Sequence, residues 1–353
     1  MNGTYYLINV IYIRLLLILL LVFYHAFAIY GGSWPPVEAM GQLQDIKLYY
    51  WLDKLSYACL LEMFVFISGH VFGYQVRTKG ESKLEAKNLL LGKFKRLLVP
   101  SMFFSLLYIL LFEDTSQPMF SILYSIVKGV GHMWFLPMLF WCFLFVWIIE
   151  RLHLSWKFIL PTLTVLSLCS VIPLPLQLAQ SFYYMLFFYV GYILQRENFE
   201  IKKNKGLVVA ISFVVFAILF PLITIYCEDI PRPGGGNYEV ATILWAIVRN
   251  GGYLLISTLG IIFIWGIITV LLEGYSQSDS YTIPKWLIET SKLCMGVYIF
   301  QQFILKFVWY NTTLPSILGI YIAPWVFFII TLIISLICSF IIRKTALGRF
   351  LIG

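Results

Sequence analysis

Charged residues are scarce in this chain of 353 residues. Only 12% of them are Asp, Glu, Lys or Arg, whereas 61% are hydrophobic. A soluble domain carries about twice that charged fraction, so water cannot be the solvent for most of this surface. The net charge of +8 does not indicate a nucleic-acid-binding protein, because the basic residues stand in short segments between apolar runs. Such segments are typical orientation signals of membrane proteins.

Paired cysteines and metal-binding patterns are lacking as well. The six cysteines are scattered singly, mostly within apolar runs, and no CxxC pair or His/Cys cluster occurs. The sequence therefore predicts neither a disulfide framework nor a metal site, and we expect the thiols to be small buried groups. There is also no long polar linker and no internal repeat. Residues 1–353 are accordingly predicted to form a single integral-membrane domain.

Long apolar runs follow one another along the chain, each near the roughly 20 residues that a bilayer-spanning helix needs. They predict an all-α, polytopic membrane bundle of about ten transmembrane helices. Ala26-Phe27-Ala28 resembles a signal-peptide cleavage site, but Arg14 interrupts the apolar run and no basic residue precedes it, so we expect the first segment to remain as a span. The predicted spans are 6–29, 53–76, 97–113, 132–150, 158–173, 178–195, 207–226, 241–272, 293–310 and 317–342.

Basic residues are concentrated on alternate connections between these spans. By the positive-inside rule this side is the cytoplasm, and both termini are predicted to lie there. The chain is thus expected to be a multi-pass protein of the inner or plasma membrane. The opposite connections carry few bases; one of them, 227–240, includes the Pro- and Gly-rich stretch 231–237, which cannot be regular helix. The basic segments are 77–96, 151–157, 196–206, the stretch from Lys285 to Lys292, and the tail after Ile342.

Two ionisable residues, Arg14 and His25, lie in the first predicted span. A charged group at mid-membrane costs about 2.5–3.5 kcal/mol on insertion scales, so such residues usually face the interior of the bundle. Eleven residues correspond to three helical turns plus about 20°, which places both side chains on one stripe, about 16 Å apart along the axis. There are two alternatives: Arg14 could snorkel to the headgroups, and His25 could sit at the outer interface.

Three further residues are predicted to line a substrate cavity. Glu62 lies near the middle of the second span, where an ion pair with Arg14 is the alternative to a role in the reaction. His132 and Trp134 begin the fourth span on the outer side, where a place in the interfacial aromatic belt is the alternative. His70 is expected near the cytoplasmic interface.

Six short segments stand in series along nearly the whole chain. They are Arg14 with His25 after ten intervening residues, Phe64–His70, Lys95–Pro100, Trp134–Pro137, Phe188–Tyr192 and Ser291–Phe300. In order and spacing these segments resemble motifs of the integral-membrane acyltransferase-3 family, whose members O-acylate surface carbohydrates and related molecules. The chain departs from the family pattern at His70, where an aromatic residue is usual, and at Gln301-Gln302, where a His often follows.

The resemblance implies an O-acyltransferase that uses an acyl-CoA, usually acetyl-CoA, and that employs Arg14 and His25. Their chemistry suits these roles. A neutral imidazole is basic enough at physiological pH to take the proton of an acceptor hydroxyl, and a permanently charged guanidinium can bind a phosphate or orient the reacting groups. Lys93, Lys95 and Arg96, next to the third span, are the predicted site for the donor phosphates; the alternative is that they only set topology and contact anionic lipid.

We therefore predict transfer of an acetyl group to a hydroxyl of a cell-envelope carbohydrate or lipid-linked glycan. The expected partners are acyl-CoA, that acceptor and membrane lipids, with no nucleic acid. The main alternative is a transporter or flippase for a lipid-linked glycan or small anion, because such proteins also place charges inside a bundle; the absence of matching halves argues against it. A purely structural assembly partner is the third possibility.

Overall fold

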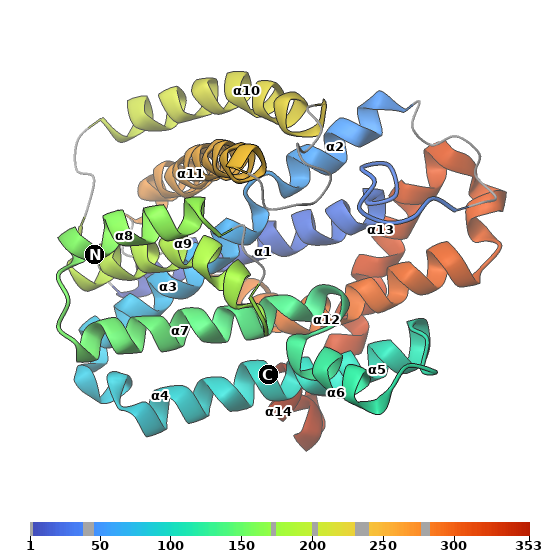
Figure 1. Ribbon diagram of the computed structural model, residues 1–353, viewed down its shortest axis with the longest axis horizontal. Coiled ribbons are helices and arrows are strands. Elements are labelled where there is room, and N and C mark those ends of the chain that lie inside the picture. The colour runs from blue at the N-terminus through green and yellow to red at the C-terminus, as the bar shows by residue number, and fades with distance from the viewer. Residues whose placement is uncertain (1–2, 38–45, 171–173, 200–203, 230–239, 277–282) are drawn as a thin grey trace. The chain divides into compact units, whose positions relative to one another are not determined.

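The computed structural model describes residues 3–37, 46–170, 174–199, 204–229, 240–276 and 283–353 (Figure 1). It is 86% helical, and the described residues form no strand, which confirms the all-α class. The predicted stretch 231–237 lies outside the described residues. The chain divides into two compact units, residues 1–60 with 263–353 and residues 61–262.

By length and composition, eight described helical segments are candidates to cross a membrane. The predicted span 158–173 is α8 (Trp156–Leu168), whose 13 residues extend only about 20 Å and cannot cross a core of about 30 Å. The predicted span 178–195 is α9 (Leu178–Arg196), which is mostly buried and is not among the eight candidates. The polytopic bundle is confirmed with eight candidates, and the cytoplasmic location of both termini stays a prediction.

The first unit combines both ends of the chain. α1 (Gly3–Phe27) packs against α2 (Lys47–Tyr57) and against α12 (Lys285–Asn311) and α13 (Leu314–Arg343). The last part of α11 (Val240–Ser276) also belongs to this unit. α14 (Ala346–Ile352) folds back onto α13, and its Gly348 lies so close to the Ile342 carbonyl that a Cβ would collide with it.

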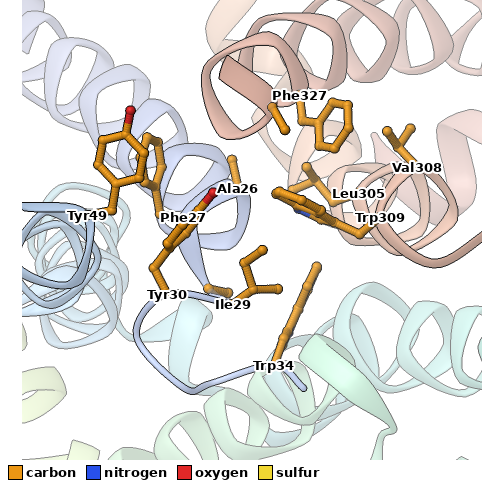
Figure 2. Close-up of a cluster of buried hydrophobic side chains, with 12 residues drawn as sticks. Ala26, Phe27, Ile29, Tyr30, Trp34, Tyr49, Leu305, Val308, Trp309 and Phe327 are labelled. Carbon is orange, nitrogen blue, oxygen red and sulfur yellow. The ribbon is translucent and has the colours of Figure 1, made fainter. Parts of the chain in front are cut away.

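An aromatic core joins α1 to α12 and α13 in the first unit (Figure 2). Trp309 of α12 is fully buried against the ring of Phe327 of α13, with centroids 4.6 Å apart. Tyr30, just after α1, donates its hydroxyl to the Ile320 carbonyl, and burial with the nearby Tyr49 raises the pKa of Tyr30, which keeps the phenol a donor. This core fixes the end of α1 that carries His25.

The second unit contains the helices from α3 (Leu60–Lys79) to most of α11. They are η3 (Glu81–Leu84), α4 (Ala86–Lys93), the π-helix η4 (Phe94–Leu98), α5 (Val99–Phe112), α6 (Met119–Lys128), η5 (Gly131–Trp134), α7 (Phe135–Arg151), α8, α9 and α10 (Lys205–Asp229). α4, η4 and α5 form one helical run of 27 residues, so much of the predicted loop 77–96 is the start of a span. Basic and hydrophobic residues therefore lie on one helix. The hydropathy of the sequence had divided this helix into a basic segment and a separate span.

Glycine allows α3 and α9 to cross at backbone contact. A Cβ on Gly69 would collide with the Phe188 carbonyl, and a Cβ on Gly191 with the Phe66 carbonyl. Small residues at a crossing let two helices approach more closely than any other side chain permits, and this is a common arrangement in membranes. The crossing brings α9 residues next to the buried face of α3, where Glu62 lies.

Candidate active site

Arg14 and His25 lie on a face of α1 that is largely buried within the first unit. Ile18 and Leu21 occupy the same face between them, at 4% and 2% exposure. His25 is buried at 7% exposure, and Arg14 is half-buried. The stripe that the sequence predicted therefore faces protein along most of its length. The catalytic roles of Arg14 and His25 stay predictions.

His25 is held in one tautomer by its own helix. Its Nδ1 lies 3.1 Å from the carbonyl oxygen of Leu21. Because a carbonyl only accepts, Nδ1 must carry the hydrogen, and the lone pair of the neutral imidazole is then on Nε2. The ring lies between Tyr24 and Trp34, with centroid distances of 4.9 Å and 5.7 Å. This arrangement orients an imidazole with a basic nitrogen pointing away from its helix backbone.

Arg14 lies about 16 Å further along the same helix. Its charge acts on the thiol of Cys294, so the guanidinium is near α12, which packs against α1. The fork of five N–H donors on a guanidinium can hold a phosphate or a carboxylate through two parallel bonds. The first unit thus carries a fixed cation and an oriented imidazole at two levels of one helix face.

A buried carboxylate next to this helix end was missed by the sequence reasoning. Asp53 of α2 is 1% exposed and abuts the turn at Gly31, where a Cβ would collide with the carboxylate. Its charge also reaches Tyr24, whose hydroxyl donates to Ser33 Oγ at 3.0 Å. A single acidic residue in the amphipathic run 47–57 was the available signal. That signal does not suffice, because only the tertiary structure places α2 against the turn after His25.

Glu62 belongs to a polar cluster in the second unit. The hydroxyl of Tyr183 donates to Glu62 Oε1 at 3.4 Å, and Ser257 also hydrogen-bonds with Glu62. These three residues come from α3, α9 and α11, and Glu62 is 8% exposed. Arg14 belongs to the other unit, so the alternative of an Arg14–Glu62 ion pair stays a prediction.

His132 and Trp134 stand on η5, immediately before α7. His132 is buried with its ring 6.4 Å from that of Tyr108, and Trp134 is 6.1 Å from the ring of Tyr184. The ring centroids of Tyr184 and Tyr183 are 5.0 Å apart, and the hydroxyl of Tyr183 bonds to Glu62. Two tyrosine rings thus lie between Trp134 and Glu62. The structure thus brings the three predicted cavity residues into one unit, while their role toward a substrate stays a prediction.

The three residues predicted to bind the acyl donor differ in their exposure. Lys93 is half-buried, with Nζ 3.6 Å from the ring centroid of Phe143, which is a cation–π contact. Lys95 and Arg96 are exposed on the π-helix η4, which joins α4 to α5. Single-turn π-helices are frequent at functional sites, and this one gathers the basic residues at the start of a span. Donor binding at these three residues stays a prediction.

His70 is enclosed by protein. It is 4% exposed at the crossing of α3 and α9, with Nε2 3.0 Å from Nε2 of Gln195 and its ring stacked on Phe66. The nearby Gly191 lets α9 come close enough to enclose the ring, while the depth of His70 near the cytoplasmic interface stays a prediction. Among the described residues no group of three or more His, Cys, Asp or Glu could hold a metal ion.

The comparison with protein families decides the class of this protein. A family model described as "Acyltransferase domain", that of the acyltransferase-3 family, matches residues 7–344. The chain belongs to this family. The protein is thus a multi-pass membrane acyltransferase, which moves an acyl group from a donor to an acceptor. No curated protein and no solved structure matches the chain.

Proposed function

We propose that this acyltransferase transfers an acetyl group from acetyl-CoA to a hydroxyl of a cell-envelope carbohydrate, and that it works in the inner or plasma membrane. The observation that carries the proposal is the tautomer of His25. With Nδ1–H bonded to the Leu21 carbonyl, Nε2 has the lone pair that a general base needs. Membership of the acyltransferase family supports an enzyme rather than a transporter.

In this proposal the hydroxyl of the acceptor approaches Nε2 of His25. Nε2 removes the proton as the hydroxyl oxygen attacks the thioester carbonyl, and the C–S bond then breaks to release CoA thiolate, which takes up a proton. The burial of His25 and the rings of Tyr24 and Trp34 exclude water, which would otherwise compete as an acceptor. The acceptor is a free sugar hydroxyl or one on a lipid-linked glycan.

Arg14 and the basic residues of η4 are assigned to the donor. The nucleotide part of acetyl-CoA is strongly anionic, and Arg14 is a permanent cation on the same helix face as His25. The pantetheine arm of the donor is a long, flexible chain, which suits two groups about 16 Å apart along one helix. Lys93, Lys95 and Arg96 are proposed to receive phosphates at the cytoplasmic end of the second unit.

The test is transfer of radiolabelled acetyl from acetyl-CoA by purified protein in vesicles, with CoA release measured in parallel. His25→Asn retains a side-chain amide that can donate to the Leu21 carbonyl but has no basic nitrogen, so turnover should fall by about 10²–10⁴. His153→Asn is the matched control, because His153 is exposed after α7 at a φ of 49°, which Asn tolerates. If His25→Asn protein inserted normally into the membrane and kept wild-type turnover, His25 would not be the general base.

Arg14 is tested through the donor. Arg14→Lys keeps the charge and loses the two-pronged geometry, so the KM for acetyl-CoA should rise while some turnover remains. Arg14→Ala should abolish measurable transfer. If both variants inserted normally and kept the wild-type KM, Arg14 would have no part in donor binding. A glycan profile of cells with and without the protein, read by mass spectrometry, identifies the acceptor.

A further inference from the structure

α6 has its serines toward the protein and its large apolar side chains outward. Phe120 is 81% exposed and Met119 70%, and Leu123, Tyr124 and Val127 extend the same exposed stripe. Ser121 and Ser125 are half-buried on the opposite face, which packs against the protein at α5. A helix at a water surface shows the reverse arrangement. The exposed side of α6 is thus apolar from Met119 to Val127 and ends at the exposed Lys128, and an apolar medium along this stripe fits the arrangement.

The apolar surface of α6 continues onto a membrane span. α5 belongs to the candidate span Ala86–Phe112 and exposes Phe103, Leu106, Leu110 and Leu111. α5 and α6 are in contact (Figure 1). Hydrocarbon that covers the exposed side of α5 accordingly extends over the stripe on α6.

α6 is too short to cross the membrane and instead returns alongside α5. Its 10 residues extend about 15 Å, half of a hydrocarbon core of about 30 Å. After α6, the Val130 N–H donates to Ser105 Oγ at 3.1 Å, and Ser101 Oγ donates to the Met133 carbonyl at 3.1 Å. Ser105 and Ser101 lie about 10 Å and 16 Å below the end of α5. The chain thus leaves α5 at Phe112 and comes back to the middle of the same helix.

The non-helical backbone at the inner end of α6 has polar partners. The peptide groups of Val130 and Met133 are bonded to Ser105 and Ser101, and Gln177 Nε2 donates to the Lys128 carbonyl at 3.2 Å. Gly129 and Gly131 provide the positive φ angles of the turn, 86° and 57°. Irregular backbone at membrane depth is tolerated only when it is buried and bonded in this way.

We propose that residues 119–134 form a re-entrant segment. It enters the membrane from the side on which α5 ends, its Met119–Val127 stripe contacts the hydrocarbon chains of phospholipid, and its inner end holds His132 and Trp134 beside Ser101 and Ser105. His132 is then inside the membrane and not at the outer interface where the sequence placed it. This proposal does not depend on the chemistry assigned to His25.

The test measures depth at two positions of α6. A fluorescent amino acid is introduced singly at Phe120 or Val127 of the full chain, in vesicles of phosphatidylcholine brominated near the headgroup or near the chain end. Seven helical residues correspond to about 10 Å, so shallow bromine should quench position 120 more strongly and deep bromine position 127. Leu110 and Phe103 of α5 are the matched pair, because they are exposed, seven residues apart and should give the same two depths in the opposite chain order.

A second measurement covers the case in which a fluorescent variant does not fold. A photo-crosslinking amino acid at Leu123 should form an adduct with phospholipid in native membranes, whereas the same group at Ser125, on the protein-facing side, should not. Equal depths at 120 and 127 would show a helix flat on the surface and overturn the proposal. Absence of quenching at both positions, or an adduct of Leu123 with another protein, would overturn it as well.

Discussion

His25 and Glu62 are both ionisable, both buried and both on helices of a membrane protein, but their partners differ in kind. One hydrogen bond of His25 is local, from Nδ1 to the Leu21 carbonyl four residues earlier in the same helix. The bonds of Glu62 reach α9 and α11, 121 residues and more away along the chain. A local bond orients the ring on its own helix, whereas bonds to distant helices hold a bundle together.

The difference teaches that burial of an ionisable group does not by itself identify a catalytic residue. Each buried polar group must be satisfied, and bonds between helices in a membrane contribute about 0.6 kcal/mol on average. Two such partners satisfy the carboxylate of Glu62, and its place in a substrate cavity stays a prediction. The Nδ1 bond of His25 orients its ring on α1, and proton transfer by this ring is the role proposed above.

The largest expected effect concerns the pH dependence of turnover. If His25 is the base, protonation removes its lone pair, so the rate should fall about tenfold for each unit below the pKa of the imidazole in the enzyme. The residual activity of His25→Asn should lose this dependence, while His153→Asn should retain it. The profile is measured from acetyl transfer between pH 5 and pH 8. If the residual rate of His25→Asn still decreased at low pH as in the wild type, the distinction between His25 and Glu62 would not hold.

The next effect is on stability and concerns Glu62. Glu62→Ala removes the carboxylate with which Tyr183 and Ser257 hydrogen-bond, and the free energy of unfolding should decrease by about 1–3 kcal/mol. Glu62→Gln keeps an oxygen that accepts both bonds and should recover most of this loss. Unfolding in mixed detergent micelles provides the measurement. Equal stability of the Ala and Gln variants would show that the cluster does not hold the helices together.

The smallest effect is expected at Tyr183. Its bond to Glu62 is long, at 3.4 Å, so Tyr183→Phe should cost only about 0.6 kcal/mol of unfolding free energy, the average for a hydrogen bond between membrane helices. The same unfolding assay measures it, with Tyr226→Phe as a control at an exposed tyrosine of α10. A loss as large as that of Glu62→Ala would mean that Tyr183, and not the carboxylate, is the centre of the cluster.

Helix content and the helix face that carries Arg14 and His25 could be predicted from the sequence because both depend on residues close together in the chain. The apolar run of α1 and the spacing of Arg14 and His25 define one helix face, and the structure buries most of that face. The span count is less firmly predicted. Eight segments are candidates by length and composition, while α8 is short and α9 is enclosed by neighbours through Gly69 and Gly191.

The predicted site residues show the same limit. The sequence predicts a loop at Lys93, but this residue lies over the ring of Phe143, 50 residues later, within a continuous helical run. His132 is predicted at the outer end of a span because it precedes a long apolar run, and only the structure shows that its neighbours Val130 and Met133 are bonded to Ser105 and Ser101 of α5. Asp53 was not recognised, since nothing near it in the chain distinguishes it from a surface acid.

The sequence by itself determined that this protein is a polytopic helical membrane protein of the acyltransferase-3 family, because scarcity of charge, apolar runs and motif spacing are properties of composition and of single helices. Only the tertiary structure decided which ionisable side chains are buried, which partners they have and where the chain turns back within the membrane. The physical reason is that burial and hydrogen bonding depend on helices brought together from distant parts of the chain. The glycines and serines at which these helices meet produce no periodic pattern in the sequence of any single helix.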